Sequence, residues 1–294
     1  MTRVLKFALF AASLMAGVSA FAAEHEGVSP SAEKLMGEHG LITNSMVTSW
    51  VVAVVVIILV RLAVRKPRLV PTRGQAVVEG FLQGVIDLTA PIVGQRVAKP
   101  VLPLLIALFT YILTQNWSGL FPGVGTVYVK GAGGSWMEFV RPGNADLNST
   151  LALALVATAC WFYFITRYAG LGFVVKDLFG NKADRAEVPA YIYFPLFAVF
   201  FAVGVIEVIS ILVRPISLSL RLFGNVFGGE NLLHAMSSIT RWGLPIPFYF
   251  LELLIGFVQA LVFVLLVSVY IGLICNHGDD HGSDHGHGHE PAAH

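Results

Sequence analysis

The stretch that decides the fold runs from Arg214 to Glu230 and reads RPISLSLRLFGNVFGGE. It lies within residues 189–239, an apolar segment long enough to cross a bilayer, for which about 20 residues suffice. Ionisable groups at membrane depth are costly, and they are functional candidates by default. Arg221, Glu230 and the preceding Glu207 are therefore the first candidate site residues.

Small residues surround the arginine on one face of the helix that this stretch predicts. At about 100° per residue, four small residues fall within about 60° of Arg221. They are Ser210, Ser217, Gly224 and Gly228. A GxxxG pair alone is weak, because it is common in membrane helices as a packing motif. Together with an arginine on the same face, it indicates a partner helix that slides past the charge. For Arg214, beside Pro215, a functional role stands against a structural one, in which the guanidinium lies at the headgroups or pairs with another of these charges.

Composition places the whole chain in a membrane. Of its 294 residues 56% are hydrophobic and 13% charged, with a mean hydropathy of +0.74, more apolar surface than one soluble core could hide. The 19 basic and 18 acidic groups leave a net charge of +1, which gives no case for nucleic-acid binding. The two cysteines, Cys160 and Cys275, imply no disulfide framework.

We expect an all-α integral membrane domain over residues 45–275, with five crossings and one interfacial helix. The crossings are predicted at 47–64, 99–120, 146–167, 189–239 and 247–274. Over 74–92, polar residues recur at every fourth position among apolar ones, which favours an amphipathic helix in the interface. A glycine and two prolines in 241–247 predict a turn, so the last two crossings, long and tilted, form a hairpin.

Charge and composition also predict the orientation and the ends. Basic residues accumulate at 61–73 and again at 167–185, which places both stretches in the cytoplasm and the N-terminus outside. Residues 1–23 have a basic start, a short apolar core and an Ala-rich end, the pattern of a cleaved signal peptide. An uncleaved first membrane helix is the alternative, but the apolar core is too short for one. Residues 24–44 then form an external N-terminal segment.

The predicted hairpin places four polar residues in two pairs, each pair at one depth in the membrane. With its turn centred near residue 240, Arg221 lies at the depth of Gln259, and Glu230 at the depth of Glu252. Two carboxylates that face each other in a low-dielectric site cannot both be ionised cheaply, so they should titrate as a coupled pair. A coupled pair of carboxylates of this kind is typical of a proton relay. The alternative is that the two carboxylates face different neighbours and never couple.

Residues 214–230 resemble subunit a of the F-type ATP synthases, the membrane stator of a rotary motor. The likeness covers about residues 40–275. Its further motifs are Asn116-x-x-Gly119-Leu120-x-Pro122, Asp146-Leu147-Asn148-Ser149-Thr150 and Gln259-Ala260. It implies two offset aqueous half-channels that each reach mid-membrane, where a carboxylate on the rotor ring is loaded from one side and unloaded to the other.

The resemblance also implies a role for each candidate. Arg221 is the family's essential arginine, a guanidinium that cannot give up its proton, so it draws a rotor carboxylate into ionising without passing the proton across. Glu207 matches the acidic group of the cytoplasmic half-channel. The external half-channel is matched by Asn225, Glu230, Glu252 and Gln259, and the further polar candidates are Ser217, Asn116, Asp146 and Asn148. Many members carry histidine at Glu252, so the proton count of its pair with Glu230 is open.

The implied setting is the inner membrane of a bacterial-type cell. The partners are the rotor ring of c subunits, the b-type subunits of the peripheral stalk and, indirectly, the soluble F1 head that makes ATP. This chain is expected to have no catalytic site and no cofactor. Protons are the expected ion, with sodium left open, because the ring carries the ligands of the ion.

Residues 276–294 are rich in glycine and histidine, and we expect a disordered cytoplasmic tail. Weak zinc or nickel binding is the alternative, through His277, His281, His285, His287, His289 and His294. The tail raises a second class of function, a metal-ion transporter, but only His234 falls near a crossing. A purely structural scaffold would have no use for Arg221 on a face of small residues.

Overall fold

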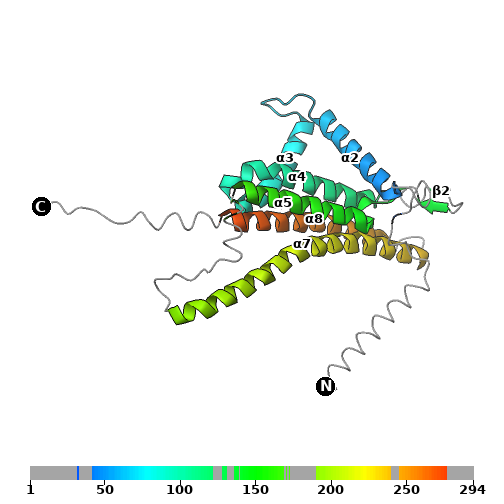
Figure 1. Ribbon diagram of the computed structural model, residues 1–294. Helices are drawn as coiled ribbons and strands as arrows, with labels where there is room; N and C mark the ends of the chain where they lie inside the picture. The colour runs from blue at the N-terminus through cyan, green and yellow to red at the C-terminus, as the bar shows by residue number, and fades with distance from the viewer. Residues whose placement is uncertain are drawn as a thin grey trace, which may run out of the picture.

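The structure, a computed structural model, describes residues 42–121, 128–130, 136–138, 140–168, 190–239 and 245–276, with Ala32, Gly170 and Gly172. The described part is helical apart from one short two-stranded ribbon (Figure 1). The predicted signal peptide, most of the predicted external segment and the His-rich tail from residue 277 onward lie outside the described residues.

Six long helices make up the described part. They are α2 (Asn44–Ala63), α3 (Arg73–Val93), α4 (Gln95–Ser118), α5 (Leu147–Tyr168), α7 (Ala190–Ile239) and α8 (Pro245–Asn276). All six are long and apolar enough to cross a membrane, so the protein is a multi-pass membrane protein. Their ends lie within about one helical turn of the predicted ones. Since α3 is also long enough to span, the split into five crossings and one interfacial helix stays a prediction.

The predicted all-α membrane fold is confirmed, and a small antiparallel ribbon lies between α4 and α5. Strand β2 (Tyr128–Lys130) pairs with β3 (Trp136–Glu138), and Val129 lies opposite Met137. Aromatic and β-branched residues suit such a pairing. Three residues are too few to reveal the alternation by which a strand is detected in a sequence.

The core lies between α4 and α8, with α5, α3 and the second half of α7 packed around them (Figure 1). Its largest fully buried apolar side chains are Phe263, Leu105, Ile112, Ile165, Leu222 and Ile271. By contrast, α2 lies at the edge, and the apolar side chains of its second half are exposed, as expected of a helix that faces lipid. Close packing of side chains holds such bundles together, because lipid gives helices no hydrophobic reason to associate.

Local sequence explains where the first helices begin and turn. The Thr43 and Thr72 side chains accept hydrogen bonds from the backbone N–H of Met46 and Gln75, so each threonine caps a helix. One residue, Gly94, joins α3 to α4 with φ 87°, a backbone conformation that favours glycine. This tight connection brings α3 against both α4 and α8.

The last two helices form the predicted hairpin, and α7 bends along its course. Its first half runs away from the bundle, whereas its second half packs against α5 and α8 (Figure 1). Pro215 lies inside α7, where a proline removes a backbone hydrogen bond and favours a kink. The bend leaves Arg221 in the packed half of the helix.

Candidate functional site

Arg221 lies on the exposed side of α7. Its neighbours Leu222 and Ser219 are buried, so the helix is packed on one side and open on the side of the guanidinium. Within the described residues Arg221 makes no hydrogen bond and no ion pair. Since a buried or membrane-embedded cation is stable only with a partner, this guanidinium is available to something outside the chain.

The small residues predicted to share its face are exposed with it. We call this face the arginine stripe, and its members are Ser210, Ser217, Arg221, Gly224 and Gly228. A Cβ atom added at Gly224 or Gly228 would meet nothing within 4 Å. The stripe is therefore a slim surface along which another helix can approach the backbone of α7.

An open groove of about 440 Å³ lies between α7 and α8 beside the arginine stripe. Arg214 and Arg221 line it from α7, and Tyr270 from α8. The Arg214 guanidinium lies over the Tyr270 ring, 4.5 Å from its centroid, at a separation typical of a cation–π contact. The carbonyl of Tyr270 also accepts a hydrogen bond from the indole of Trp161, at 3.0 Å.

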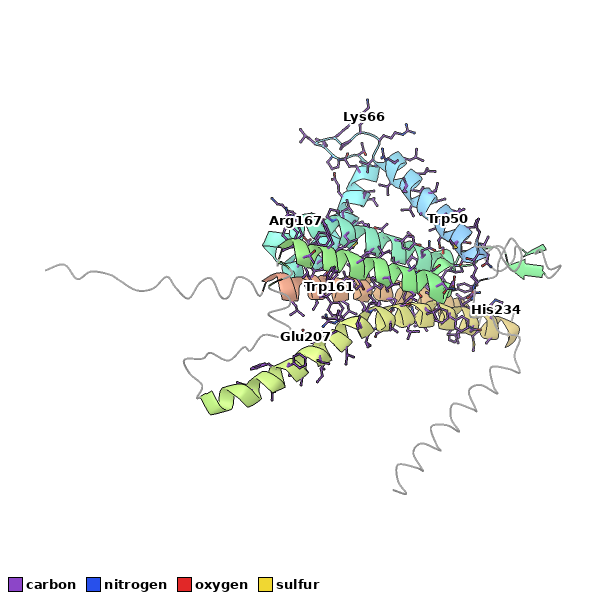
Figure 2. The ribbon with its side chains drawn as sticks, in the orientation of Figure 1. Trp50, Lys66, Trp161, Arg167, Glu207 and His234 are labelled. Atoms are coloured by element: carbon purple, nitrogen blue, oxygen red, sulfur yellow. The ribbon has the colours of Figure 1, made fainter. Side chains whose placement is uncertain are left out.

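Glu207 lies half-buried on α7, about four helical turns before Arg221. Figure 2 shows it toward the half of α7 that leaves the bundle, whereas His234 lies near the opposite end. Glu230, nine residues after Arg221 in the sequence, lies near that same end. Acidic groups thus lie on both sides of Arg221 along the helix.

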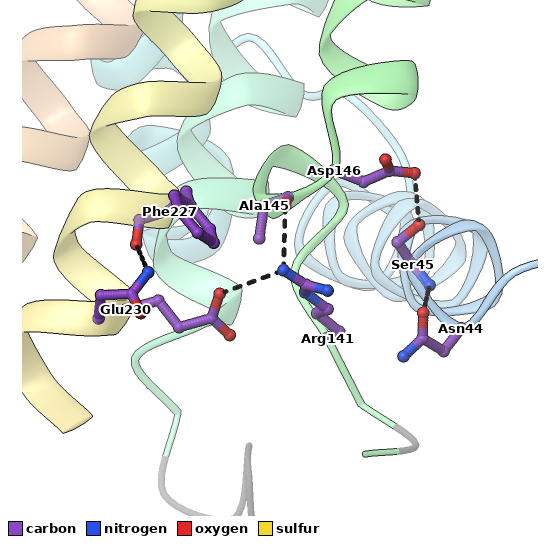
Figure 3. Close-up of polar contacts among 8 residues, drawn as sticks. Asn44, Ser45, Arg141, Ala145, Asp146, Phe227 and Glu230 are labelled. Carbon is purple, nitrogen blue, oxygen red and sulfur yellow. Dashed lines mark hydrogen bonds and ion pairs between the residues drawn. The ribbon is translucent and has the colours of Figure 1, made fainter. Parts of the chain in front are cut away.

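At the far end of α7, Glu230 meets an arginine of the loop before α5 that was not among the candidate site residues. Arg141 Nη2 lies 3.8 Å from Glu230 Oε2, with the two side chains 4% and 16% exposed (Figure 3). The same Nη2 donates to the carbonyl of Ala145, at 3.3 Å. No local signal could have revealed this pair, because the loop folds back onto a helix almost 90 residues further along the chain.

Glu252 joins these residues from α8. Its carboxylate occupies the space that a Cβ atom on Gly229 would need. This contact matches the predicted hairpin register, which sets Glu230 and Glu252 at one depth. We call Arg141, Glu230 and Glu252 the outer cluster. No hydrogen bond among the described residues joins the second predicted pair, the exposed Arg221 and the buried Gln259.

Two buried amides on the facing helices have unused donors. Asn225 Nδ2 on α7 and Gln259 Nε2 on α8 are buried and have no hydrogen-bond partner among the described residues. A buried donor without an acceptor costs about 1–3 kcal/mol. Packing alone would favour apolar side chains at these positions, so each amide is a candidate for a role beyond the fold.

Of the four further polar candidates, Asn116 and Asp146 tie segments of the bundle together. Asn116 Nδ2 donates to the carbonyl of Gly256, at 2.9 Å, and its Oδ1 accepts from Asn144, at 2.8 Å. Asp146 accepts from the hydroxyl of Ser45, at 3.1 Å, and from the backbone N–H of Asn148, at 3.2 Å. The Asn148 side chain is exposed.

An exposed arginine between acidic groups, on a helical bundle of membrane-spanning length, defines a class of membrane protein that handles ions together with a separate partner helix. Comparison with known families identifies the family within this class. The family model described as ATP synthase A chain matches residues 46–272, and the chain belongs to this family. The family is a membrane subunit of the Fo sector of ATP synthase, in which it works with the ring of c subunits, and it is not a catalytic subunit.

Proposed function

We propose that this chain is the stator that passes protons through two half-channels to and from the ring of c subunits. The observation that carries this proposal is Arg221, a permanent cation on an exposed stripe of small residues, without a partner in the described part of the chain. A carboxylate on a passing ring helix is the partner that such a cation needs.

The guanidinium acts as both a release trigger and a gate. Its positive charge favours the ionised form of a ring carboxylate opposite it, so the carboxylate releases its proton there. Because arginine does not give up its own proton, it cannot relay protons directly from one side to the other. A leak past this gate would dissipate about 2.3 kcal/mol for each charge that crosses 100 mV.

Polar side chains on either side of Arg221 supply the two half-channels. Glu230, Glu252, Asn225 and Gln259 line the outer one, where the two unused amide donors can hold water. Glu207 is the relay of the inner one, and the exposed Ser217 lies on the arginine stripe between Glu207 and Arg221.

The orientation belongs to this proposal as well. The N-terminus lies outside a bacterial-type inner membrane and the C-terminus in the cytoplasm, with b-type stalk subunits and the F1 head as further partners. Helix α3 lies in the interface, which its exposed polar residues Glu79, Gln83 and Asp87 support, with Gln83 donating to Asp87 at 2.7 Å. Sodium is the alternative ion, and synthesis in sodium-free buffer would exclude it.

Replacing Arg221 tests the proposal. In reconstituted complexes, Arg221→Ala should reduce ion-driven ATP synthesis to background, because the ring carboxylate loses its counter-charge and the half-channels lose their gate. The detached head should hydrolyse ATP as before. The matched control is Arg65→Ala, the same change at an exposed arginine in the loop between α2 and α3.

Synthesis at the wild-type rate by Arg221→Ala, in complexes that retain the full ring, would refute this role of the arginine. Loss of synthesis in both variants would point to general damage instead, and the amount of ring that copurifies separates these outcomes.

A further inference from the structure

Arg141 is held rigidly inside the protein. Its backbone N–H donates to the hydroxyl of Thr48 on α2, at 3.3 Å, and its Nη2 donates to the carbonyl of Ala145, at 3.3 Å. These bonds come from two separate segments, and the side chain is only 4% exposed. The guanidinium therefore has a defined position, from which it faces Glu230.

Among the described residues, three elements bring charged groups to the end of α7 that carries Glu230. The loop before α5 contributes Arg141 and also Asp146, whose carboxylate turns to Ser45 on α2 (Figure 3). Helix α8 contributes Glu252, against Gly229. On α7 itself, His234 lies one turn further on and is exposed. The outer cluster thus combines one permanent cation with two carboxylates.

The two carboxylates are not equivalent. Glu230 Oε2 lies 3.8 Å from Arg141 Nη2, whereas Glu252 has no ion pair and no hydrogen bond within the described residues. A guanidinium cannot be deprotonated, so the carboxylate beside it is held in its ionised form. The net charge of Arg141, Glu230 and Glu252 together is then zero when Glu252 carries a proton and −1 when Glu252 is ionised.

We propose that Arg141 is a positioning residue that keeps Glu230 ionised, so that the outer cluster exchanges a single proton, and that Glu252 is the group that carries it. This inference rests on the proposed function. It adds Arg141 to the residues of the outer half-channel and states that the outer cluster exchanges one proton. Glu230 then places a fixed negative charge beside the path, and Glu252 takes up and releases the proton.

Double variants test this assignment in whole complexes reconstituted into vesicles, with ATP-driven proton pumping as the measurement. Arg141→Gln should lower pumping about tenfold, because Glu230 loses its partner and competes for the proton. Arg141→Lys should restore most of the loss, since a lysine keeps the charge. Arg141→Gln combined with Glu230→Gln should also pump several times faster than Arg141→Gln alone, because no unbalanced charge remains.

The two glutamates should differ in this rescue. Arg141→Gln combined with Glu252→Gln should stay at background, because the proton carrier is gone. Rescue by Glu252→Gln, or by neither glutamine, would overturn the inference. Arg65→Gln serves as the matched control, and the amount of intact complex is measured for every variant. Should Arg141→Gln not assemble, Arg141→Lys and the double variant with Glu230→Gln decide, since both keep the charges balanced.

Failure of this inference is distinguishable from failure of the proposed function. Normal pumping by Glu230→Gln and Glu252→Gln as single variants would remove the outer cluster from the proton path and contradict the proposed function. Loss of pumping in Glu252→Gln alongside normal pumping in Arg141→Gln would overturn only the role of Arg141.

Discussion

Asn116 uses both ends of its side-chain amide within the fold, with Gly256 on α8 as acceptor and Asn144 before α5 as donor. Asn225 and Gln259 instead keep a buried donor that no described residue accepts. The same type of group thus stabilises the bundle at one position and remains available at two others. The difference follows from what faces each amide, because a buried polar group without a partner destabilises the fold.

Asn116→Ala tests the structural use of an amide. It leaves the Gly256 carbonyl and the Asn144 amide without this partner, which should lower stability by about 1–3 kcal/mol. The measurement is the midpoint of thermal dissociation of the purified complex in detergent. Asn148→Ala removes the same group from an exposed position and should change stability by less than about 0.5 kcal/mol. Equal midpoints for both variants would contradict this assignment.

At the scale of elements, the hairpin of α7 and α8 decides which polar residues meet. The missing side chain of Gly229 makes room for the Glu252 carboxylate. The neighbouring Gly228 points about 100° away around the helix and is exposed. Two adjacent glycines therefore have different uses, one inside the hairpin and one on the arginine stripe.

Gly229→Ala should displace the carboxylate of Glu252, since its new methyl group overlaps that carboxylate. Because the carboxylate is the far end of a flexible side chain and can move aside, stability should change by less than about 1 kcal/mol, whereas proton pumping should fall. Thermal dissociation and pumping are measured on the same preparation. The control is Gly84→Ala on α3, where an added Cβ atom meets nothing within 4 Å and both readings should stay at wild type. Normal pumping by Gly229→Ala would contradict the predicted coupling between this contact and transport.

At the scale of the whole molecule, the two ends of the bundle differ in where their basic residues lie. The loop after α2 is basic, with Arg65, Lys66 and Arg68, whereas the loop before α5 brings Arg141 inward against Glu230. In the proposed orientation the basic loops stay in the cytoplasm, and the outer cluster lies on the external side. Glu207, on the other side of Arg221, then belongs to the proposed inner half-channel, which opens to the cytoplasm.

Thiol labelling tests this orientation. In a background with Cys160→Ala and Cys275→Ala, a membrane-impermeant maleimide should label Lys66→Cys only in inverted vesicles. It should label Phe121→Cys, at a position 67% exposed, only in right-side-out vesicles. Labelling in the reverse pattern would invert the topology and exchange the two half-channels. Labelling of both positions in one type of vesicle would contradict the number of crossings between them.

Local patterns were sufficient for the elements. Apolar runs, the turn at 241–247 and helical spacing predicted the long helices, the final hairpin and the set of small residues beside Arg221, because each depends on neighbours in the chain. The ribbon of β2 and β3 was missed, since three-residue strands show no period. The composition of α3 suits both a membrane crossing and a position in the interface.

By itself, the sequence determined the membrane setting, the helices and the family, since apolar length and the spacing around Arg221 are properties of consecutive residues. Only the tertiary structure decided which polar groups meet. It brought Arg141 to Glu230, placed Glu252 against Gly229 and joined Asn116 to Gly256 by a hydrogen bond. The physical reason is that a charge or an amide acquires its role from the partner within a few ångströms, and that partner comes from a distant part of the chain.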